Sequence, residues 1–358
     1  MLTFTRISHI WTIRWSREET MLFMERLELY ISAGLSLDKA LSVVEQGMSS
    51  GRRVQVQKIH DDITGGSTLS VSLASVIGVP PLFVGIIRQG EGTGGLASSL
   101  AMARRLMEQQ DDIKKKILSA LAYPAIIGTF ALLLTIGLVK GIMPQIIPML
   151  KGLNVELPLL TRIVMAISEN ITTYGVYGCL GVILAFGTAT VLYKKFYRFR
   201  KGVHRSLAYI PLVGSLSRTL ALSVFFRSCG SLIDSGISAV AAYAQAAAAI
   251  PLIQLAEAIQ AEGMRVAKGL PLGSVIGHVS VKIPSYIPPL LLAGEASGTL
   301  GASLVRAADI IDRDIDHSLK RLTALIEPTM MAGMGGVVGA IALSIMMPIY
   351  DISRALQH

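Results

Sequence analysis

The sequence predicts an all-α membrane protein with two repeated cytoplasmic helical bundles and three transmembrane helices. Charged residues make up 16% of the 358 residues, well below the share of about 25% in an ordinary soluble domain. Three long stretches are nearly free of charge, and no stretch alternates polar and apolar residues as a half-buried strand does. The chain also contains two similar segments, GEGTGGLASSL at 90–100 and GEASGTLGASL at 294–304.

The three apolar stretches lie at 123–143, 171–193 and 328–350. Each is long enough for a membrane helix, which needs about 20 mostly apolar residues. The last two contain no charged residue, and the first contains Lys140 near its end, where a lysine can extend to the membrane surface. Three such stretches argue against the buried helices of a soluble protein.

Basic residues predict the orientation, because Lys and Arg are enriched in cytoplasmic connections. They cluster at 104–116 and 194–205, whereas the connection at 144–170 has only Lys151 and Arg162. This distribution accounts for the net charge of +9, so no nucleic-acid partner is needed. We expect a tail at 1–16, a first cytoplasmic domain at 17–122, a short connection on the opposite side at 144–170, a second cytoplasmic domain at 194–327 and a tail on the opposite side at 351–358.

The two similar segments belong to a longer internal repeat, which should be sought before other features. At an offset of 204 residues the chain pairs Gly90 with Gly294, Glu91 with Glu295, Gly94 with Gly298, Leu96 with Leu300 and Pro124 with Pro328. Upstream the likeness is weaker and the offset is 202, as in Phe23 with Phe225. The register without gaps predicts two copies of one unit.

Local signals divide each copy into helices. Ser16 and Glu19 form a capping box before a helix that ends near Gly34, and Ser36 caps a second helix that ends at Gly47. Further helices are expected at 51–64, 69–77 and 81–89 in the first copy, and at 216–233, 238–249 and 251–268 in the second.

Glycines in the two segments predict a change of direction between helices. Gly90 and Gly92, or Gly294 in the second copy, can adopt the left-handed backbone that ends a helix. Thr93 or Ser297 can then cap the next helix. We expect that next helix to continue without a break into the membrane span.

Two further features of the repeat concern its prolines and its acids. Pro124 and Pro328 are expected to kink the long helices near the membrane surface. For Glu91 and Glu295 two interpretations stay open. Each carboxylate caps a helix or holds its domain together, or each contacts a moving partner.

Motifs for catalysis and for cofactors are missing. The sequence has no GxxxxGK[ST], HExxH, GxSxG or CxxC, and its histidines are scattered. Acidic residues crowd one predicted helix at 309–316, but a solvated acidic face is favoured over a metal site because no close partner ligand is visible. Cys179 and Cys229 are expected to be free thiols. The sequence therefore predicts neither an enzyme nor a cofactor.

Small residues in two spans favour close helix packing. Gly137 and Gly141, like Gly335 and Gly339, are spaced by four residues, which lets helices approach each other. This pattern favours self-association or docking of another protein's membrane helix. A small-molecule permease or channel subunit is the alternative, but the spans show almost no polar residue at mid-membrane. A membrane enzyme would need converging acids or histidines near a span end, and none converge.

The paired GExxGxL motifs, each followed by a charged helix and a proline-headed span, resemble the type II secretion F-protein family. That family includes the inner-membrane platform proteins of type IV pili. The order of domains and spans is also similar, and the resemblance covers about residues 17–350. Its motif residues carry over as interaction residues at Gly90, Glu91, Gly94, Leu96, Gly294, Glu295, Gly298 and Leu300.

The resemblance implies an oligomeric platform in the bacterial inner membrane, with a cytoplasmic N-terminus and a periplasmic C-terminus. It implies a cytoplasmic assembly ATPase, pilin or pseudopilin subunits and other inner-membrane assembly proteins as partners. The first motif has Gly92 and Thr93 where the second has Ala296 and Ser297. The second is closer to the usual family form, so the two motifs need not serve one contact.

Overall fold

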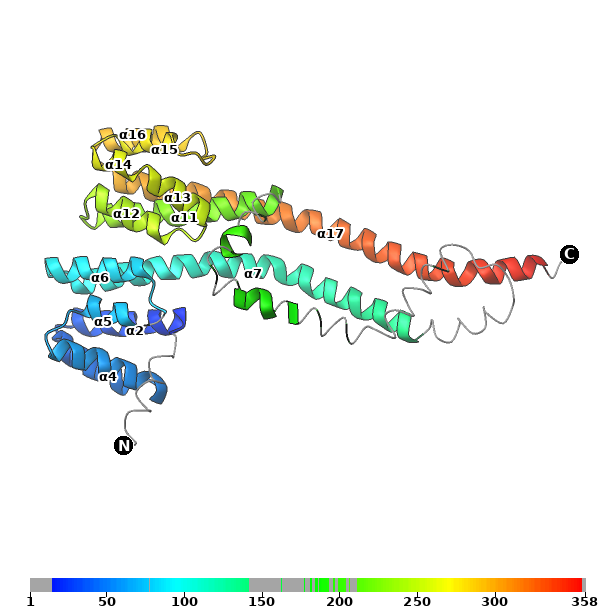
Figure 1. Ribbon diagram of the computed structural model, residues 1–358, viewed down its shortest axis with the longest axis horizontal. Helices are drawn as coiled ribbons and strands as arrows, with labels where there is room; N and C mark the ends of the chain where they lie inside the picture. The colour runs from blue at the N-terminus through cyan, green and yellow to red at the C-terminus, as the bar shows by residue number, and fades with distance from the viewer. Residues whose placement is uncertain are drawn as a thin grey trace. The chain divides into compact units, whose positions relative to one another are not determined.

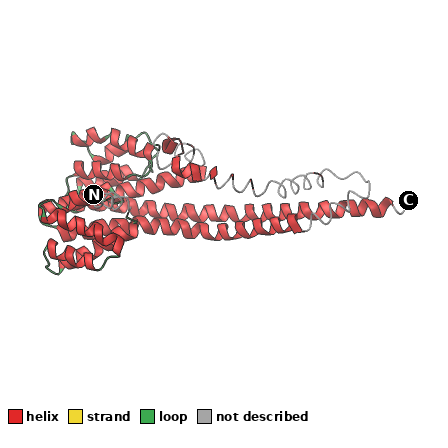
Figure 2. Cartoon of the chain, turned by 60° about the horizontal axis from the view of Figure 1, so that its bottom comes forward, coloured by secondary structure: helices red, strands yellow, loops and turns green. Residues whose placement is uncertain are grey.

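The computed structural model describes residues 15–76, 78–141 and 211–355, with shorter pieces at 162, 177, 181, 184–185, 187–192, 196, 199–203 and 206. Over these residues every regular element is an α-helix (Figures 1 and 2), which confirms the predicted all-α class. The chain divides into two units. The first comprises Met1–Lys115 and His204–Asp316, and the second comprises Lys116–Val203 and His317–His358.

The part of the first unit that precedes the spans, here called the first half, contains five short helices and the start of a long one. They are α2 (Arg17–Ser32), α3 (Leu37–Gln46), α4 (Ser50–Thr64), α5 (Leu69–Ser75), α6 (Pro81–Thr93) and α7 (Leu96–Gly141). The expected capping box opens α2, since Ser16 Oγ accepts from the Glu19 N–H at 3.1 Å and Glu19 accepts from the Ser16 N–H at 2.7 Å. Ser36 caps α3 in the same way.

The part of the first unit that follows, here called the second half, has six short helices before its long one. They are α11 (Pro211–Asp234), α12 (Ala239–Ala249), α13 (Ile253–Ala261), α14 (Gly263–Ala267), α15 (Leu272–Gly277), α16 (Ile287–Ala296) and α17 (Leu300–Ala355). The single helix expected at 251–268 is therefore two helices, which meet at Glu262.

Each half buries its own apolar core, mainly along its first helix. In the first half Phe23, Met24 and Leu27 are fully buried on α2, and Trp15 stacks edge-on against Phe23 with ring centroids 5.1 Å apart. In the second half Phe225 makes a similar edge contact with Tyr243 at 5.4 Å. Burying such a side chain stabilises a fold by about 1.5–3 kcal/mol. Trp15, inside the expected tail, is thus part of the domain.

Among the described residues, two helices are long and apolar enough to cross a membrane, within Leu96–Leu138 and Leu300–Leu343. Large apolar side chains on the second unit are exposed, including Leu118 at 73% and Phe130 at 68%, as expected for surfaces that face lipid. The stretch expected to span at 171–193, and the connection at 144–170, lie mostly outside the described residues. The third expected span belongs to α17, which continues to Ala355.

Candidate functional site

The two GExxGxL motifs lie at the junctions between a short helix and a long one. Helix α6 continues through Gly90 and Glu91 and ends at Thr93, and the next residue, Gly94, has a φ of 76°. In the second half α16 ends at Ala296, and Gly298 has a φ of 73°. Only glycine adopts this left-handed backbone without strain.

The expectation that Gly90, Gly92 or Gly294 ends the helix is therefore wrong. These glycines have no positive φ, since the helix continues past them. Thr93 and Ser297 are also not caps of the next helix. Thr93 Oγ1 donates to Gln89 O at 3.0 Å and Ser297 Oγ donates to Gly294 O at 3.2 Å, so both hydroxyls belong to the end of the preceding helix.

The first glycine of each motif permits a close approach of two helices. A Cβ atom at Gly90 would lie 2.1 Å from Ser99 Oγ, and one at Gly294 would lie 2.1 Å from Ser303 Oγ. Both glycines are buried. Any side chain here would force α6 away from α7, or α16 away from α17, so glycine is required by packing rather than by backbone conformation.

The motif glutamates bind the N-terminus of another short helix. The Glu91 carboxylate accepts from the backbone N–H of Leu69 and, at 3.2 Å, from that of Ser70, at the start of α5. Glu295 Oε2 accepts from the Leu272 N–H at 2.9 Å, at the start of α15. The first N–H groups of a helix lack an internal partner and carry partial positive charge, so a carboxylate stabilises them. This geometry favours the interpretation that the acids hold each domain together.

An arginine also joins the first helix of each half to its long helix. Arg104 on α7 binds Glu28 on α2 at 3.0 Å, and this pair raises the pKa of the Arg104 guanidinium. Arg227 on α11 binds Asp309 at 2.8 Å and Asp312 at 2.6 Å on α17. Both halves thus join these two helices by ion pairs, with the arginine on the long helix in the first half and on the first helix in the second half.

The acidic stretch at 309–316 is accordingly not a purely solvated face. Asp309 and Asp312 pair with Arg227, and Asp314 accepts from the Tyr286 hydroxyl at 2.9 Å. Partial burial and this bond raise the pKa of Tyr286 to about 12. Among the described residues no group of three His, Cys, Asp or Glu side chains could hold a metal ion.

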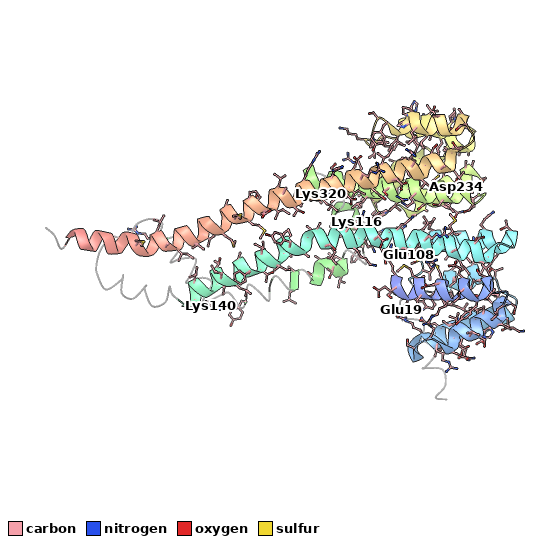
Figure 3. All side chains as sticks on the ribbon, turned by 180° about the vertical axis from the view of Figure 1, so that it is seen from behind. Glu19, Glu108, Lys116, Lys140, Asp234 and Lys320 are labelled. Carbon is pink, nitrogen blue, oxygen red and sulfur yellow. The ribbon has the colours of Figure 1, made fainter. Side chains whose placement is uncertain are left out.

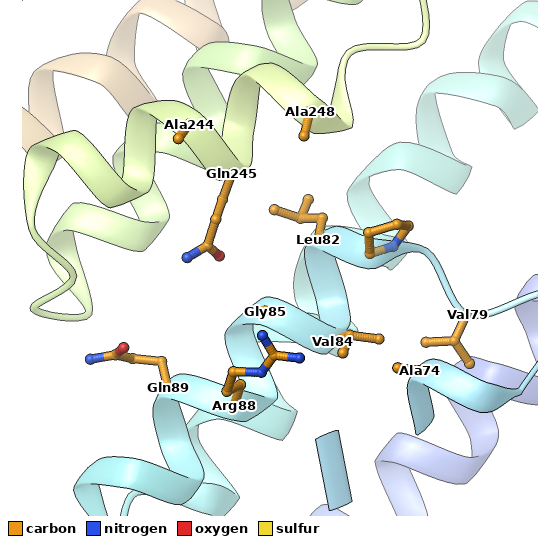
Figure 4. Close-up of a pocket in the computed structure, with 11 residues that line it drawn as sticks. Ala74, Val79, Leu82, Val84, Gly85, Arg88, Gln89, Ala244, Gln245 and Ala248 are labelled. Atoms are coloured by element: carbon orange, nitrogen blue, oxygen red, sulfur yellow. The ribbon is translucent and has the colours of Figure 1, made fainter. Parts of the chain in front are cut away.

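A cleft with a volume of about 560 Å³ lies between α6 and α12 (Figure 4). Its walls include Leu82, Gly85 and Arg88 from α6, facing Gln245 from α12. A Cβ atom at Gly85 would lie 2.7 Å from Gln245 Oε1, so the two helices come close at this point. Sequence reasoning missed this cleft, because neither helix carries a motif there.

The glycines of the expected membrane spans at the four-residue spacing have no neighbouring helix packed against them within the described part of the chain. A Cβ atom at Gly137, Gly141, Gly335 or Gly339 would have no atom within 4 Å beyond its own helix. The second unit instead brings Gly128 of α7 near α17, where a Cβ atom would lie 3.3 Å from Met330 Cε. Close packing of a helix from a second copy or from another protein at these four glycines therefore stays a prediction. Pro124 and Pro328 lie inside helices that continue through them.

Comparisons with known proteins agree with the motifs. The pattern of the family described as Type II secretion system (T2SS), protein F matches residues 23–144 and again residues 225–348. The chain is similar to the Type IV pilus assembly protein PilC of Thermus thermophilus, at 28% identity over 343 residues, which cover 95% of this chain and 84% of that protein.

Two further relatives give the same result. PilC of Pseudomonas aeruginosa is 25% identical over 337 residues, covering 94% of this chain and 90% of that protein. The Type II secretion system protein F of Xanthomonas campestris pv. campestris is 27% identical over 342 residues, covering 93% and 82%. This family agrees with the prediction that the chain is a membrane platform protein and not an enzyme. The chain belongs to the Type II secretion system protein F family.

Proposed function

We propose that this chain is the inner-membrane platform of a type IV pilus or type II secretion assembly machine. In this role it couples a cytoplasmic assembly ATPase to the insertion of pilin or pseudopilin subunits into the fibre. The observation that carries the proposal is helix continuity. The helix that begins at each GExxGxL motif is the helix that enters the expected membrane span.

Helices α7 and α17 contain 46 and 56 residues. With a rise of about 1.5 Å per residue, they extend roughly 69 Å and 84 Å along their axes. Glu108, Lys116 and Lys140 follow one another along α7, from the cytoplasmic bundle to the far end of the expected span (Figure 3). A displacement of a bundle can therefore be transmitted to the membrane, since packed helices shift as rigid elements.

The motif residues support this role by fixing each long helix to its bundle. Gly90 allows α6 to pack tightly on α7, Glu91 ties α6 to α5, and Gly94 sets the turn between α6 and α7. Gly294, Glu295 and Gly298 do the same for α17. Each long helix is then held by the bundle on which the ATPase acts.

The proposal includes the arrangement expected from the sequence. The two halves are copies of one unit, and three spans at 123–143, 171–193 and 328–350 leave the N-terminus cytoplasmic and the C-terminus periplasmic. The platform self-associates and contacts other inner-membrane assembly proteins, without nucleic acid. The family match on both halves supports the duplication, and the basic clusters support the topology.

The test interrupts α7 between bundle and span. One variant carries seven Gly and Ser residues inserted between Lys115 and Lys116, and its control carries seven residues of high helix propensity at the same place. Seven residues return a helix to within about 20° of the same face. We expect the flexible insertion to retain ATPase co-purification and abolish fibre assembly or secretion, while the helical control keeps both. Full assembly with the flexible insertion would contradict the proposal.

A further inference from the structure

The two halves of the first unit contain corresponding helices. At the offset of 202, α2 and α3 correspond to α11 and α12. Gly34 and Gly236 both have positive φ, at 89° and 84°, and Ser36 and Ser238 both cap the following helix. At the offset of 204, α6 and α7 correspond to α16 and α17. Each residue of these helices therefore has a counterpart in the other half.

Inside the first unit the two halves meet through different helices. The first half uses α6 and α7, and the second half uses α11 and α12. Ser235, directly after α11, donates to Met102 Sδ on α7 at 2.9 Å. A narrow crevice beside this contact is lined by Leu106 and Gln109 of α7 and by Val224 and Arg227 of α11. The α6–α12 cleft belongs to the same contact.

This contact is heterologous, because each half contributes a different surface. Each half therefore keeps one surface that has no partner within this contact. In the first half it is the surface of α2 and α3, which corresponds to the α11/α12 surface that the second half uses. In the second half it is the surface of α16 and α17, which corresponds to the α6/α7 surface that the first half uses. A heterologous contact can be repeated from molecule to molecule, and it closes into a ring where the rotation permits.

The unused surface of the first half is apolar and exposed. We call it the α2/α3 face, and its residues are Leu22, Glu25, Leu29, Ala33 and Val43. Leu22, Leu29 and Val43 are 40%, 63% and 38% exposed. The counterparts of this face include Val224, Arg227, Ser235 and Gln245, which all face the first half in the contact already described.

The unused surface of the second half matches the α6/α7 side of the first. We call it the α16/α17 face, and its residues are Tyr286, Leu292, Arg306, Ile310 and Arg313. Tyr286 and Leu292 are 39% and 40% exposed, whereas Leu82 and Leu106, the counterparts of Tyr286 and Ile310, are 6% and 3% exposed. The Tyr286–Asp314 hydrogen bond joins the two helices of this face.

Charges on the two faces are complementary. Glu25 is the counterpart of Arg227, and Arg313 is the counterpart of Gln109. Arg227 and Gln109 line the same crevice, so a repeated contact brings Glu25 of one molecule near Arg313 of the next. Ala33 and Arg306 are the counterparts of Ser235 and Met102, which are in direct contact.

We propose that the α2/α3 face of one molecule binds the α16/α17 face of a second copy, in the geometry that joins the two halves within one chain. This inference specifies the surfaces for the self-association that the proposed function includes. Both bundles are expected on one side of the bilayer, so a contact of this kind keeps successive molecules in the same membrane orientation.

Cysteine cross-linking in native membranes tests the contact directly. In a background of Cys179→Ser and Cys229→Ala, one tagged form carries Ala33→Cys and a differently tagged form carries Arg306→Cys. We expect oxidation to give a species with both tags, several-fold more abundant than with the control pair Asp61→Cys and Arg306→Cys. Asp61 is exposed on α4 and is not a residue of the α2/α3 face. Equal yields from both pairs would overturn the proposal.

A charge exchange in the full-length protein gives an independent readout. Glu25→Arg alone and Arg313→Glu alone are expected to weaken self-association several-fold in lipid nanodiscs. The double variant restores it, and an equimolar mixture of the two single variants restores it as well, because the reversed face of each variant meets a complementary face on the other. Self-association that none of these changes affects would overturn this interface and leave the proposed function standing.

Two other outcomes separate the proposals. If the protein is monomeric in membranes, both the self-association and this interface are wrong. The insertion in α7 then still tests the coupling to the ATPase independently. Cross-linking of the Ala33→Cys variant to a different assembly protein, with no second copy captured, shows that another partner covers the α2/α3 face and overturns the proposal.

Discussion

Glu295 accepts a hydrogen bond from the backbone N–H of Leu272 at 2.9 Å, and this contact joins the end of α16 to the start of α15. Glu91 makes the equivalent connection from α6 to α5. Each motif glutamate, which the sequence alone allows to contact another protein, thus has a partner within its own half. The motif specifies a junction of three helices.

Replacing Glu295 by Ala should release the first turn of α15. Loss of a helix cap costs about 0.5–2 kcal/mol, which corresponds to roughly a two- to thirtyfold increase in local opening. Hydrogen exchange at the amides of Leu272 and Gly273 measures this opening. Glu295→Gln, which keeps an acceptor oxygen, should show a smaller increase. Unchanged exchange in Glu295→Ala would show that the carboxylate does not hold α15.

Replacing Gly90 by Ala should separate α6 from α7. The new Cβ would lie 2.1 Å from Ser99 Oγ and 2.5 Å from Ser99 Cβ, and such overpacking costs about 1–3 kcal/mol. Gly92→Ala is the matched control, because it lies in the same helix with nothing within 4 Å of its Cβ. Ala is favoured over Gly inside a helix by up to about 1 kcal/mol, so the control should raise the melting temperature.

The free energy of unfolding of the Gly90→Ala variant should recover in part when Ser99 is also changed to Gly, since the clash with the Ser99 side chain is then removed and only the tight contact with Gly95 O at 3.0 Å is left. Thermal unfolding of the full-length protein in detergent checks all four proteins under one condition. Equal melting temperatures for Gly90→Ala and Gly92→Ala would contradict the packing role of Gly90.

Local signals in the sequence predicted much of the helical pattern, because caps and glycines act over a few residues. Ser16 with Glu19, Ser36, and the glycines after α4 mark helix ends as expected. Within the GExxGxL motifs the same reasoning chose the wrong glycine. Four glycines between 90 and 95 can all adopt positive φ, and only the position of Ser99 on the neighbouring helix shows that Gly90 is needed for close packing instead.

Contacts between distant segments could not be predicted from the sequence, because the local signals that mark helix ends act over only a few residues. No residue near Asp309 or Asp312 indicates that Arg227 is their partner. Arg227 lies more than 80 residues earlier and reaches them only because α11 packs on α17. The exposed faces of α2, α3, α16 and α17 could be recognised only by comparing each residue with a counterpart in a packed interface. The offsets of 202 and 204 identify the counterpart of each residue, and the structure shows which of these counterparts lie in the contact between the two halves.

Stability of the first half should depend on pH through Glu19. Burial raises the pKa of this carboxyl, but hydrogen bonds from the Ser16 backbone and from Arg52 outweigh it, so the pKa lies below the ordinary value of 4.5. A lowered folded-state pKa stabilises the fold above the unfolded value, and this contribution is lost as pH falls through the folded value. Glu19→Gln should therefore be less stable than the wild type at pH 7.

The difference between wild type and Glu19→Gln should shrink as the pH falls below about 4.5, the range in which the wild-type carboxylate takes up its proton. Thermal unfolding from pH 7 down to pH 3 measures it, with Glu18→Gln as the neighbouring control on the same turn of α2. A difference that stays constant over this range would show that Glu19 contributes through packing and not through its charge.

Cys229 should report unfolding of the second half. Its thiol is fully buried on α11, and burial raises its pKa to about 12. Because the thiolate is the reactive form, the folded protein at pH 8 should resist a maleimide reagent. In a Cys179→Ser background, labelling should begin only at the denaturant concentration or temperature at which the helical circular dichroism of the bundles is lost. Rapid labelling of the folded protein would show that α11 opens locally, and the contacts of α11 with α12 and α17 would then be too weak to hold Arg227 against its acidic partners.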